Sequence, residues 1–215
     1  VIGHPHLDVD RSIIKAMKKR DIMLFTPYHD FGHVIRLLRE AAIDPKVKEI
    51  KVTLYRLADD SKIISALVNA AKNGKKVTVF IELQARFDEA NNIKWTNRLR
   101  GEGIKVVSGV PGLKVHSKLT LIRRDEGLEK LVDYCVIGTG NYHEGTAKVY
   151  TDYHLMTSDK RISKEARKVF QFIESPYKQY KFKHLLVSPN TTRDRLYRLI
   201  DREIEHARAG EKAEF

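Results

Sequence analysis

Short apolar runs rich in β-branched residues alternate along the chain with segments of helical spacing, and this alternation limits the folds open to it. Strand-like runs lie at residues 21–25, 49–57, 76–83, 104–108, 117–122, 131–138 and 152–158. Segments with helical spacing lie at residues 10–20, 29–42, 61–73, 91–100, 160–174 and 190–210. Strands that alternate with helices form a sheet covered by helices. The sequence therefore predicts an α/β fold.

Two of the strand-like runs, at residues 77–83 and 131–137, are apolar over most of their length. Central strands buried on both faces have this character, which is most common in parallel sheets. The strand-like runs in the second half follow one another more closely, so some antiparallel pairing is also expected there. The prediction is a mixed, mostly parallel sheet flanked by helices on both faces.

The end of the chain is expected to belong to a second domain. The stretch from Ser175 to His184 is rich in Pro, Tyr and Lys and is the best candidate for a boundary. The long helix after it is amphipathic, with an apolar stripe formed by Leu196, Leu199, Ile200 and Ile204. We therefore expect one domain at residues 1–183 and, at residues 184–215, the truncated opening helix of another.

The net charge of the chain is +12, from 40 Lys and Arg residues against 28 Asp and Glu residues. A charge balance this basic favours a polyanionic partner, which could be nucleic acid, an anionic membrane or a phosphate-rich substrate. The alternative is a generic basic surface without a specific partner. No apolar run approaches the ~18 residues that a membrane-spanning helix needs.

Cys135 is the only cysteine, and it lies in the apolar stretch LVDYCVIG. A single cysteine excludes a disulfide framework or a cysteine metal site within one chain. We expect Cys135 to be buried in the core. A reducing, cytoplasmic location fits this composition, and peripheral association with a membrane is left open.

The segment GLKVHSKL places His116 two residues before Lys118, so both side chains share a face if the segment is extended. An imidazole nitrogen can attack phosphorus, and its ordinary pKa near 6.5 leaves it partly neutral at cellular pH. A neighbouring ammonium can hold the phosphoryl oxygens. Alone, a His-x-Lys pair is also typical of an ordinary surface histidine beside a lysine.

About twenty residues later, Gly138-Thr-Gly140-Asn141 follows the strand-like run at 131–138. A glycine-rich turn brings backbone N–H groups and the Asn141 side chain close to an anion. The plainer reading is a strand exit that uses glycine for its positive φ. The combination of His-x-Lys with this turn is more specific than either part.

The combination resembles the half-site of the phospholipase D superfamily, and longer stretches are similar to long-chain polyphosphate kinases. The similar stretches are KVTLYRLADDSKI, ELQARFDEANNIKW, GLKVHSKL, GTGNYHEGTAKVYTDY and EIEHARAG. The resemblance runs essentially from end to end. It implies a phospholipase D-like fold and the first of two such catalytic domains.

The resemblance also implies roles for individual residues. His116 matches the histidine that becomes phosphorylated, and Lys118 and Asn141 match phosphate-holding positions. Tyr150 matches a tyrosine that lies against ATP. Two further matches, Arg56 and Arg86, belong to the magnesium–phosphate site. Because a guanidinium has no acceptor to offer a cation, we expect these arginines to hold phosphates that in turn hold Mg²⁺.

The implied reaction is reversible transfer of the terminal phosphate of ATP to inorganic polyphosphate through a phosphohistidine. The implied partners are ATP, Mg²⁺ and polyphosphate, with no specific nucleic acid, and a homo-oligomer in the full-length protein. The chain contains a single His-x-Lys half-site, so alone it is expected to be inactive or very weak.

Two alternatives from other classes stay open. One is a phospholipase D-like phosphodiesterase or nuclease, although the superfamily's Asp five residues after the Lys is Arg123 here. The other is a non-enzymatic polyanion-binding module, whose affinity would depend on salt and not on His116.

Overall fold

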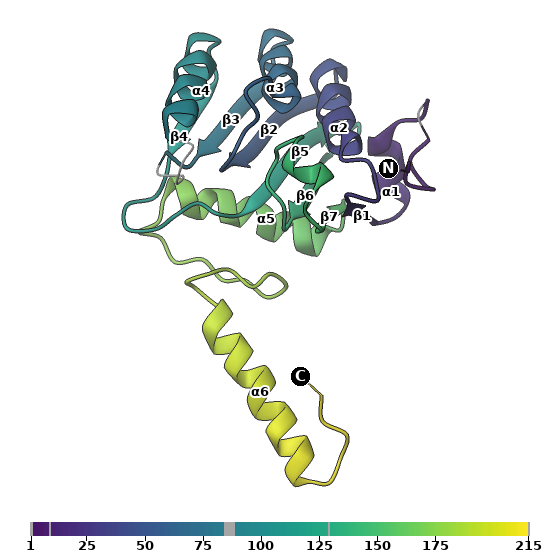
Figure 1. Cartoon of the computed structure of the whole chain (residues 1–215), viewed down its shortest axis with the longest axis vertical. Helices are drawn as coiled ribbons and strands as arrows, with labels where there is room; N and C mark the ends of the chain where they lie inside the picture. Colours follow the sequence, from purple (N-terminus) through teal and green to yellow (C-terminus); the bar gives the residue numbers. More distant parts are fainter. Residues whose placement is uncertain (1, 9, 84–88, 129, 215) are drawn as a thin grey trace.

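The computed structural model describes residues 2–8, 10–83, 89–128 and 130–214 (Figure 1). Its strands are β1 (Ile22–Thr26), β2 (Val47–Leu54), β3 (Lys76–Ile81), β4 (Lys105–Ser108), β5 (Lys118–Asp125), β6 (Leu131–Gly138) and β7 (Asp152–Thr157). Its α-helices are α1 (Ile13–Lys19), α2 (Gly32–Ile43), α3 (Lys62–Lys72), α4 (Glu89–Gly101), α5 (Lys160–Glu174) and α6 (Thr192–Arg208), and a 3₁₀-helix, η1, spans Thr146–Lys148. The predicted α/β fold is confirmed.

The strands form one sheet in the order β1-β7-β6-β5-β2-β3-β4 within the described ranges. The neighbours β2–β3 and β3–β4 are parallel. The pairs β1–β7, β2–β5, β5–β6 and β6–β7 are antiparallel. The sheet is therefore mixed, as predicted, but the prediction that it is mostly parallel is wrong.

The connections between the later strands explain the difference. Parallel neighbours need a crossover of a dozen or more residues, usually a helix. The chain instead turns tightly between β5 and β6, where the Lys130 N–H donates to the Gly127 carbonyl at 3.1 Å. Gly127 and Leu128 both have positive φ in this turn. Helices connect β1 to β2 (α2), β2 to β3 (α3) and β3 to β4 (α4), and of these pairs β2–β3 and β3–β4 are neighbours in the sheet.

Helices cover both faces of the sheet, which confirms the layered arrangement. Figure 1 shows α2, α3 and α4 along one side of the sheet and α5 along the other. Residues of β3 alternate between the two cores: Val79 and Ile81 pack toward the first, and Phe80 packs against Phe170 of α5 with ring centroids 5.0 Å apart. Cys135 lies in this second core, as predicted, and burial raises the pKa of its thiol to about 12.

Helix α6 projects away from the sheet, beyond the segment that follows α5 (Figure 1). None of its described residues is buried. Its exposed apolar side chains include all four of the predicted stripe, Leu196, Leu199, Ile200 and Ile204. No helix among the described residues combines the length and the apolar character needed to cross a membrane.

Candidate active site

The topology gathers several of the sequence-predicted residues at one edge of the sheet. The carboxyl ends of β2, β3 and β6 lie at this edge, together with the amino ends of β5 and β7. Lys118, the first residue of β5, pairs with Gly138, the last residue of β6, and Gly138 pairs with His154 of β7. The predicted His-x-Lys pair and the glycine-rich turn are therefore neighbours.

His116 and Lys118 are in direct contact at this edge. The Lys118 Nζ lies 3.2 Å from His116 Nδ1 and 3.1 Å from Nε2, and it donates to the His116 carbonyl at 2.6 Å. His116 is exposed, whereas the Lys118 side chain is buried. The lysine is thus fixed beneath an accessible imidazole.

The surroundings favour a neutral imidazole. Burial lowers the pKa of His116, and the Lys118 ammonium lowers it further. Arg56 and Lys114 act in the same direction. Burial also lowers the pKa of Lys118 to about 8, with Asp152 opposing the shift. At neutral pH the site therefore combines an uncharged imidazole, whose nitrogen can act as a nucleophile, with a lysine that is still mostly protonated.

One buried polar side chain from β2 and another that directly follows β3 hold the segment that carries His116. The Thr53 hydroxyl donates to the Ser117 carbonyl at 2.6 Å and accepts from the Leu119 N–H at 2.9 Å. The Glu82 carboxylate accepts from the Val115 N–H at 2.9 Å. These bonds satisfy backbone groups at the point where β5 leaves its ladder with β2.

Three further residues of the site, Thr53, Glu82 and Tyr55, were not predicted from the sequence. Tyr55 follows β2, and its ring meets the His116 ring at 81°, with centroids 4.6 Å apart. Each of the three is a polar or aromatic residue inside or directly after an apolar strand. The sequence signal that could have indicated them is a polar residue in an apolar run, although this pattern does not identify the residue that it contacts.

The glycine-rich turn needs glycine because neighbouring side chains leave no room for a Cβ. Neither Gly138 nor Gly140 has a positive φ, so the reading that they serve an unusual φ is wrong. A Cβ on Gly138 would lie 2.5 Å from His154 Nδ1, and one on Gly140 would lie 2.4 Å from Asp152 Oδ2. The next residue, Asn141, has a buried Oδ1 without a hydrogen-bond partner in the described structure.

The remaining predicted residues fall in three places. Arg56 is at the site, because its charge lowers the pKa of both His116 and Lys118. Arg86 lies outside the described residues. Tyr150 is exposed just after η1 and does not line the pocket beside His116.

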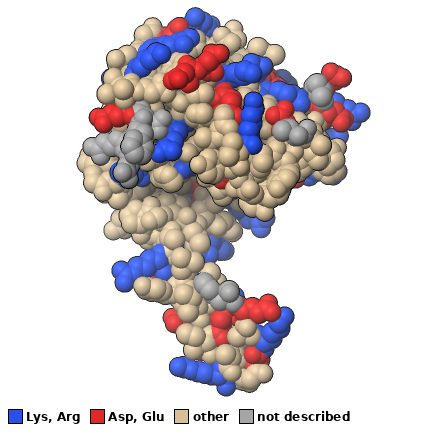
Figure 2. Space-filling model, viewed as in Figure 1, with Lys and Arg blue, Asp and Glu red and all other residues tan. Residues whose placement is uncertain are grey.

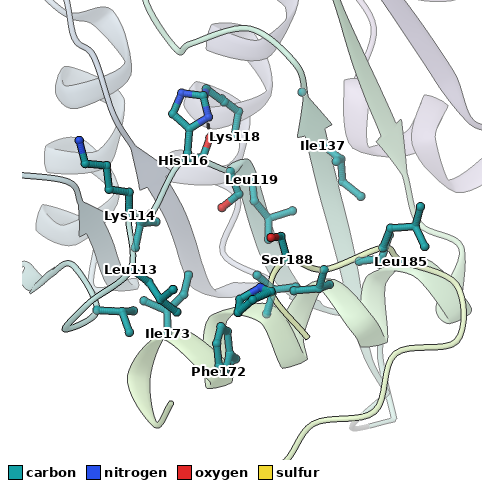
Figure 3. Close-up of a pocket in the computed structure, with 18 residues that line it drawn as sticks. Leu113, Lys114, His116, Lys118, Leu119, Ile137, Phe172, Ile173, Leu185 and Ser188 are labelled. Atoms are coloured by element: carbon teal, nitrogen blue, oxygen red, sulfur yellow. Dashed lines mark hydrogen bonds between the residues drawn. The ribbon is translucent and has the colours of Figure 1, made fainter. Parts of the chain in front are cut away.

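A pocket of about 520 Å³ opens beside His116. Figure 3 shows His116, Lys118 and Lys114 at its rim, with apolar side chains of α5 and of the segment before α6 deeper inside. The apolar lining includes Val110, Leu113, Ile137, Val169, Phe172, Ile173, Leu185 and Pro189. The basic side chains of the pocket that could bind a phosphate group therefore lie at its rim, and the apolar interior offers none.

The surface charges are mixed on the face drawn in Figure 2, where Lys and Arg alternate with Asp and Glu rather than joining in one basic patch. This face therefore shows no single basic patch that would account for the net charge of +12. Within the described ranges, no three His, Cys, Asp or Glu side chains are grouped so that they could hold a metal ion. The ammonium groups of Lys114 and Lys118 at the rim suit phosphate oxygens.

His154, next to the glycine turn, makes stability sensitive to acid. Burial lowers its pKa to about 4, far below the ordinary 6.5. As pH falls from 6.5 to 4, His154 becomes protonated in the unfolded chain but stays largely neutral in the folded chain. This difference lowers the free energy of unfolding by about 3 kcal/mol. Urea unfolding at pH 7 and pH 4 should therefore show a smaller loss in His154→Gln than in the wild type.

The control for this measurement is the exposed His6, because His6→Gln should keep the acid sensitivity of the wild type. An equal loss of stability in His154→Gln and the wild type would contradict the role given to His154.

Comparison with known proteins places these features in a family. The family described as polyphosphate kinase C-terminal domain 1 matches residues 12–179. The polyphosphate kinase of Vibrio parahaemolyticus is 52% identical over 199 residues, which cover 93% of this chain and 28% of that protein. The polyphosphate kinase of Yersinia pestis is 52% identical over 212 residues, covering 99% of this chain and 31% of that protein.

Solved structures agree on the fold. The crystal structure of polyphosphate kinase from Porphyromonas gingivalis has a TM-score of 0.85 and 40% identity, covering 95% of this chain and 34% of that one. Nuc from Salmonella typhimurium, a phospholipase D family member, has a TM-score of 0.55 and 18% identity, covering 72% of this chain and 93% of that one, which supports the fold alone. The chain spans about a third or less of the polyphosphate kinases it matches. With the family match over most of its length, the chain belongs to the polyphosphate kinase family.

Proposed function

We propose that the full-length protein transfers the terminal phosphate of ATP reversibly to inorganic polyphosphate through a phosphohistidine at His116. The observation that carries this proposal is the contact between the exposed His116 imidazole and the buried Lys118 ammonium. A neutral imidazole is the nucleophile that this chemistry needs, and the ammonium is placed to receive phosphoryl oxygens.

The reaction has two steps. A nitrogen of His116 bonds to the γ-phosphorus of ATP, while the bond from that phosphorus to the β–γ bridging oxygen breaks and ADP leaves with the electron pair. A terminal oxygen of polyphosphate then attacks the same phosphorus, and the N–P bond breaks to restore the neutral imidazole. The reverse sequence makes ATP from polyphosphate.

The chain's cations stabilise the transferring group. Lys118 and Arg56 hold its oxygens, and Arg86 is proposed to join them, because cations aimed at the equatorial oxygens are the main source of catalysis in phosphoryl transfer. Asn141 is proposed to hold a further phosphate oxygen through its amide N–H groups, and Tyr150 to lie against the nucleotide.

Mg²⁺ fits this site as part of the MgATP substrate. The residues at the rim offer donors to phosphate rather than acceptors to a metal, and Mg²⁺ commonly binds through phosphates and water. It would neutralise charge on the phosphates that Arg56 and Lys118 hold.

A second half-site is proposed to come from the rest of the protein. We propose that residues 1–183 form the first catalytic domain and that residues 184–215 open the second. The exposed stripe of α6 supports this division, because an apolar helix face is normally covered. The 215-residue chain alone is then expected to bind phosphate with little or no turnover.

The phosphodiesterase alternative is weakened at one position. Arg123, which stands where the wider superfamily has an Asp, forms an ion pair with Asp133 at 3.1 Å and lies along β5. Nothing at that position can serve as the carboxylate partner of a half-site.

An assay with two substrates separates the candidate functions. The full-length protein should convert MgATP and a polyphosphate primer to longer polyphosphate and ADP, and the 215-residue chain should not. Neither should cleave bis(p-nitrophenyl) phosphate. Diester cleavage without ATP would favour the phosphodiesterase, and salt-sensitive polyphosphate binding without either reaction would favour the binding module.

A further inference from the structure

We propose that Tyr55 is a positioning residue for phosphoryl transfer, whose ring holds the His116 imidazole and the Lys118 ammonium in the orientation that the reaction requires. The inference rests on the proposed function and adds a residue to it. Tyr55 acts through the two groups it touches and needs no contact with the phosphate.

One aromatic ring meets three groups of the site at once. The ring of Tyr55 meets the His116 ring nearly edge to face, at 81° and a centroid distance of 4.6 Å. The Lys118 Nζ lies 5.3 Å from the centroid of the Tyr55 ring, and the Arg56 guanidinium carbon lies 6.0 Å from it. Both contact types are attractive, since an aromatic face is negative and an aromatic edge is positive.

The contact restrains an imidazole that otherwise has few constraints. His116 is exposed and precedes β5, so its ring needs a packing partner to hold one rotamer. The Lys118 ammonium alone cannot provide it, because an ammonium fixes a distance to the ring but not the tilt of the ring plane. The near-perpendicular contact with Tyr55 sets that tilt.

Tyr55 is itself anchored to a rigid frame. The Asn92 side chain of α4 donates through Nδ2 to the Tyr55 carbonyl and to the Glu82 carbonyl, each at 2.9 Å. Asn92 is fully buried. It therefore ties the end of β2 to the end of β3, and Glu82 in turn binds the Val115 N–H of the segment that carries His116. The backbone of Tyr55 and the segment that carries His116 are therefore held by the same buried hydrogen bonds, those of Asn92 and Glu82.

The test compares two substitutions in the full-length protein. Tyr55→Phe keeps the ring and should keep the rate of phosphohistidine formation from γ-labelled ATP within about threefold of the wild type. Tyr55→Leu keeps apolar volume without an aromatic face and should lower that rate on the order of 10- to 100-fold, because small misplacements of a reacting group have effects of this size. The KM for ATP should change little, because the hydrogen bond from the Lys118 Nζ to the His116 carbonyl still holds the ammonium when the ring is absent, so that mainly the imidazole loses its orientation.

Tyr177→Leu is the matched control, because Tyr177 is 81% exposed in the segment after α5 and does not line the pocket. Thermal unfolding of each variant shows whether a lower rate comes from loss of the fold or from a misplaced His116 imidazole in a folded protein. A normal rate in Tyr55→Phe would identify loss of the aromatic ring as the cause of the lower rate in Tyr55→Leu.

The outcomes are distinguishable. A lower rate in a folded Tyr55→Leu with an unchanged KM, and recovery in Tyr55→Phe, would support the positioning role. Normal labelling in Tyr55→Leu would overturn that role and leave the proposed function standing. No label in the wild type would overturn the proposed function and, with it, the role of Tyr55 in the transfer.

Discussion

Replacing His116 with alanine is expected to lower polyphosphate synthesis by the full-length protein on the order of 10⁴-fold or more. Alanine removes the only atoms that form the N–P bond in the proposed mechanism. Lys118 and Arg56 keep their positions, because the segment is held by Thr53 and Glu82 rather than by the imidazole. Nucleotide binding should therefore be largely retained while turnover is lost, and initial rates of ADP release measure this.

His6→Ala is the matched control, since His6 is an exposed histidine of the N-terminal segment that contacts Arg20. It should keep the wild-type rate. If His116→Ala still made polyphosphate at a rate within tenfold of the wild type, covalent catalysis by His116 would be excluded.

Replacing Gly140 with alanine is expected to destabilise the protein by about 1–3 kcal/mol, the usual cost of forcing an extra group into a packed site. The new Cβ would lie 2.4 Å from Asp152 Oδ2, 2.5 Å from Cγ and 2.8 Å from Cβ. Either the turn or the start of β7 must then move. Since Asn141 and Asp152 both lie there, phosphoryl transfer should also slow, and denaturant unfolding with a rate assay measures both effects.

Gly101→Ala provides the comparison, because a Cβ on Gly101 would meet nothing within 4 Å and its φ is not positive. Gly101 ends α4, so alanine there should be neutral or add up to about 1 kcal/mol. Equal stabilities of the two alanine variants would show that the turn has room for a side chain.

Strands with long apolar runs could be predicted from the sequence, but their pairing could not. The apolar runs of β3 and β6 reflect burial on both faces, and this is as true of an antiparallel strand under two helix layers as of a parallel one. Whether two neighbouring strands run parallel or antiparallel depends on the segment that connects them. The tight turn at Gly127 and Leu128, not the composition of β6, makes this part of the sheet antiparallel.

The contact between His116 and Lys118 could be predicted from the sequence, whereas the contacts that support them could not. His116 and Lys118 are two residues apart, so their proximity is local. The contacts of Thr53 with Ser117, Glu82 with Val115 and Asn92 with Tyr55 join residues 64, 33 and 37 positions apart. No periodicity in the sequence encodes such pairs, because they arise only when β2, β3 and β5 meet at one edge.

The most direct test of the proposed mechanism is to incubate the full-length protein with γ-labelled ATP and Mg²⁺ and to map the labelled peptide. Acid-labile, alkali-stable label on the peptide that contains His116, absent from His116→Ala, is the predicted result. Label on a different residue, or polyphosphate synthesis without any labelled intermediate, would contradict it.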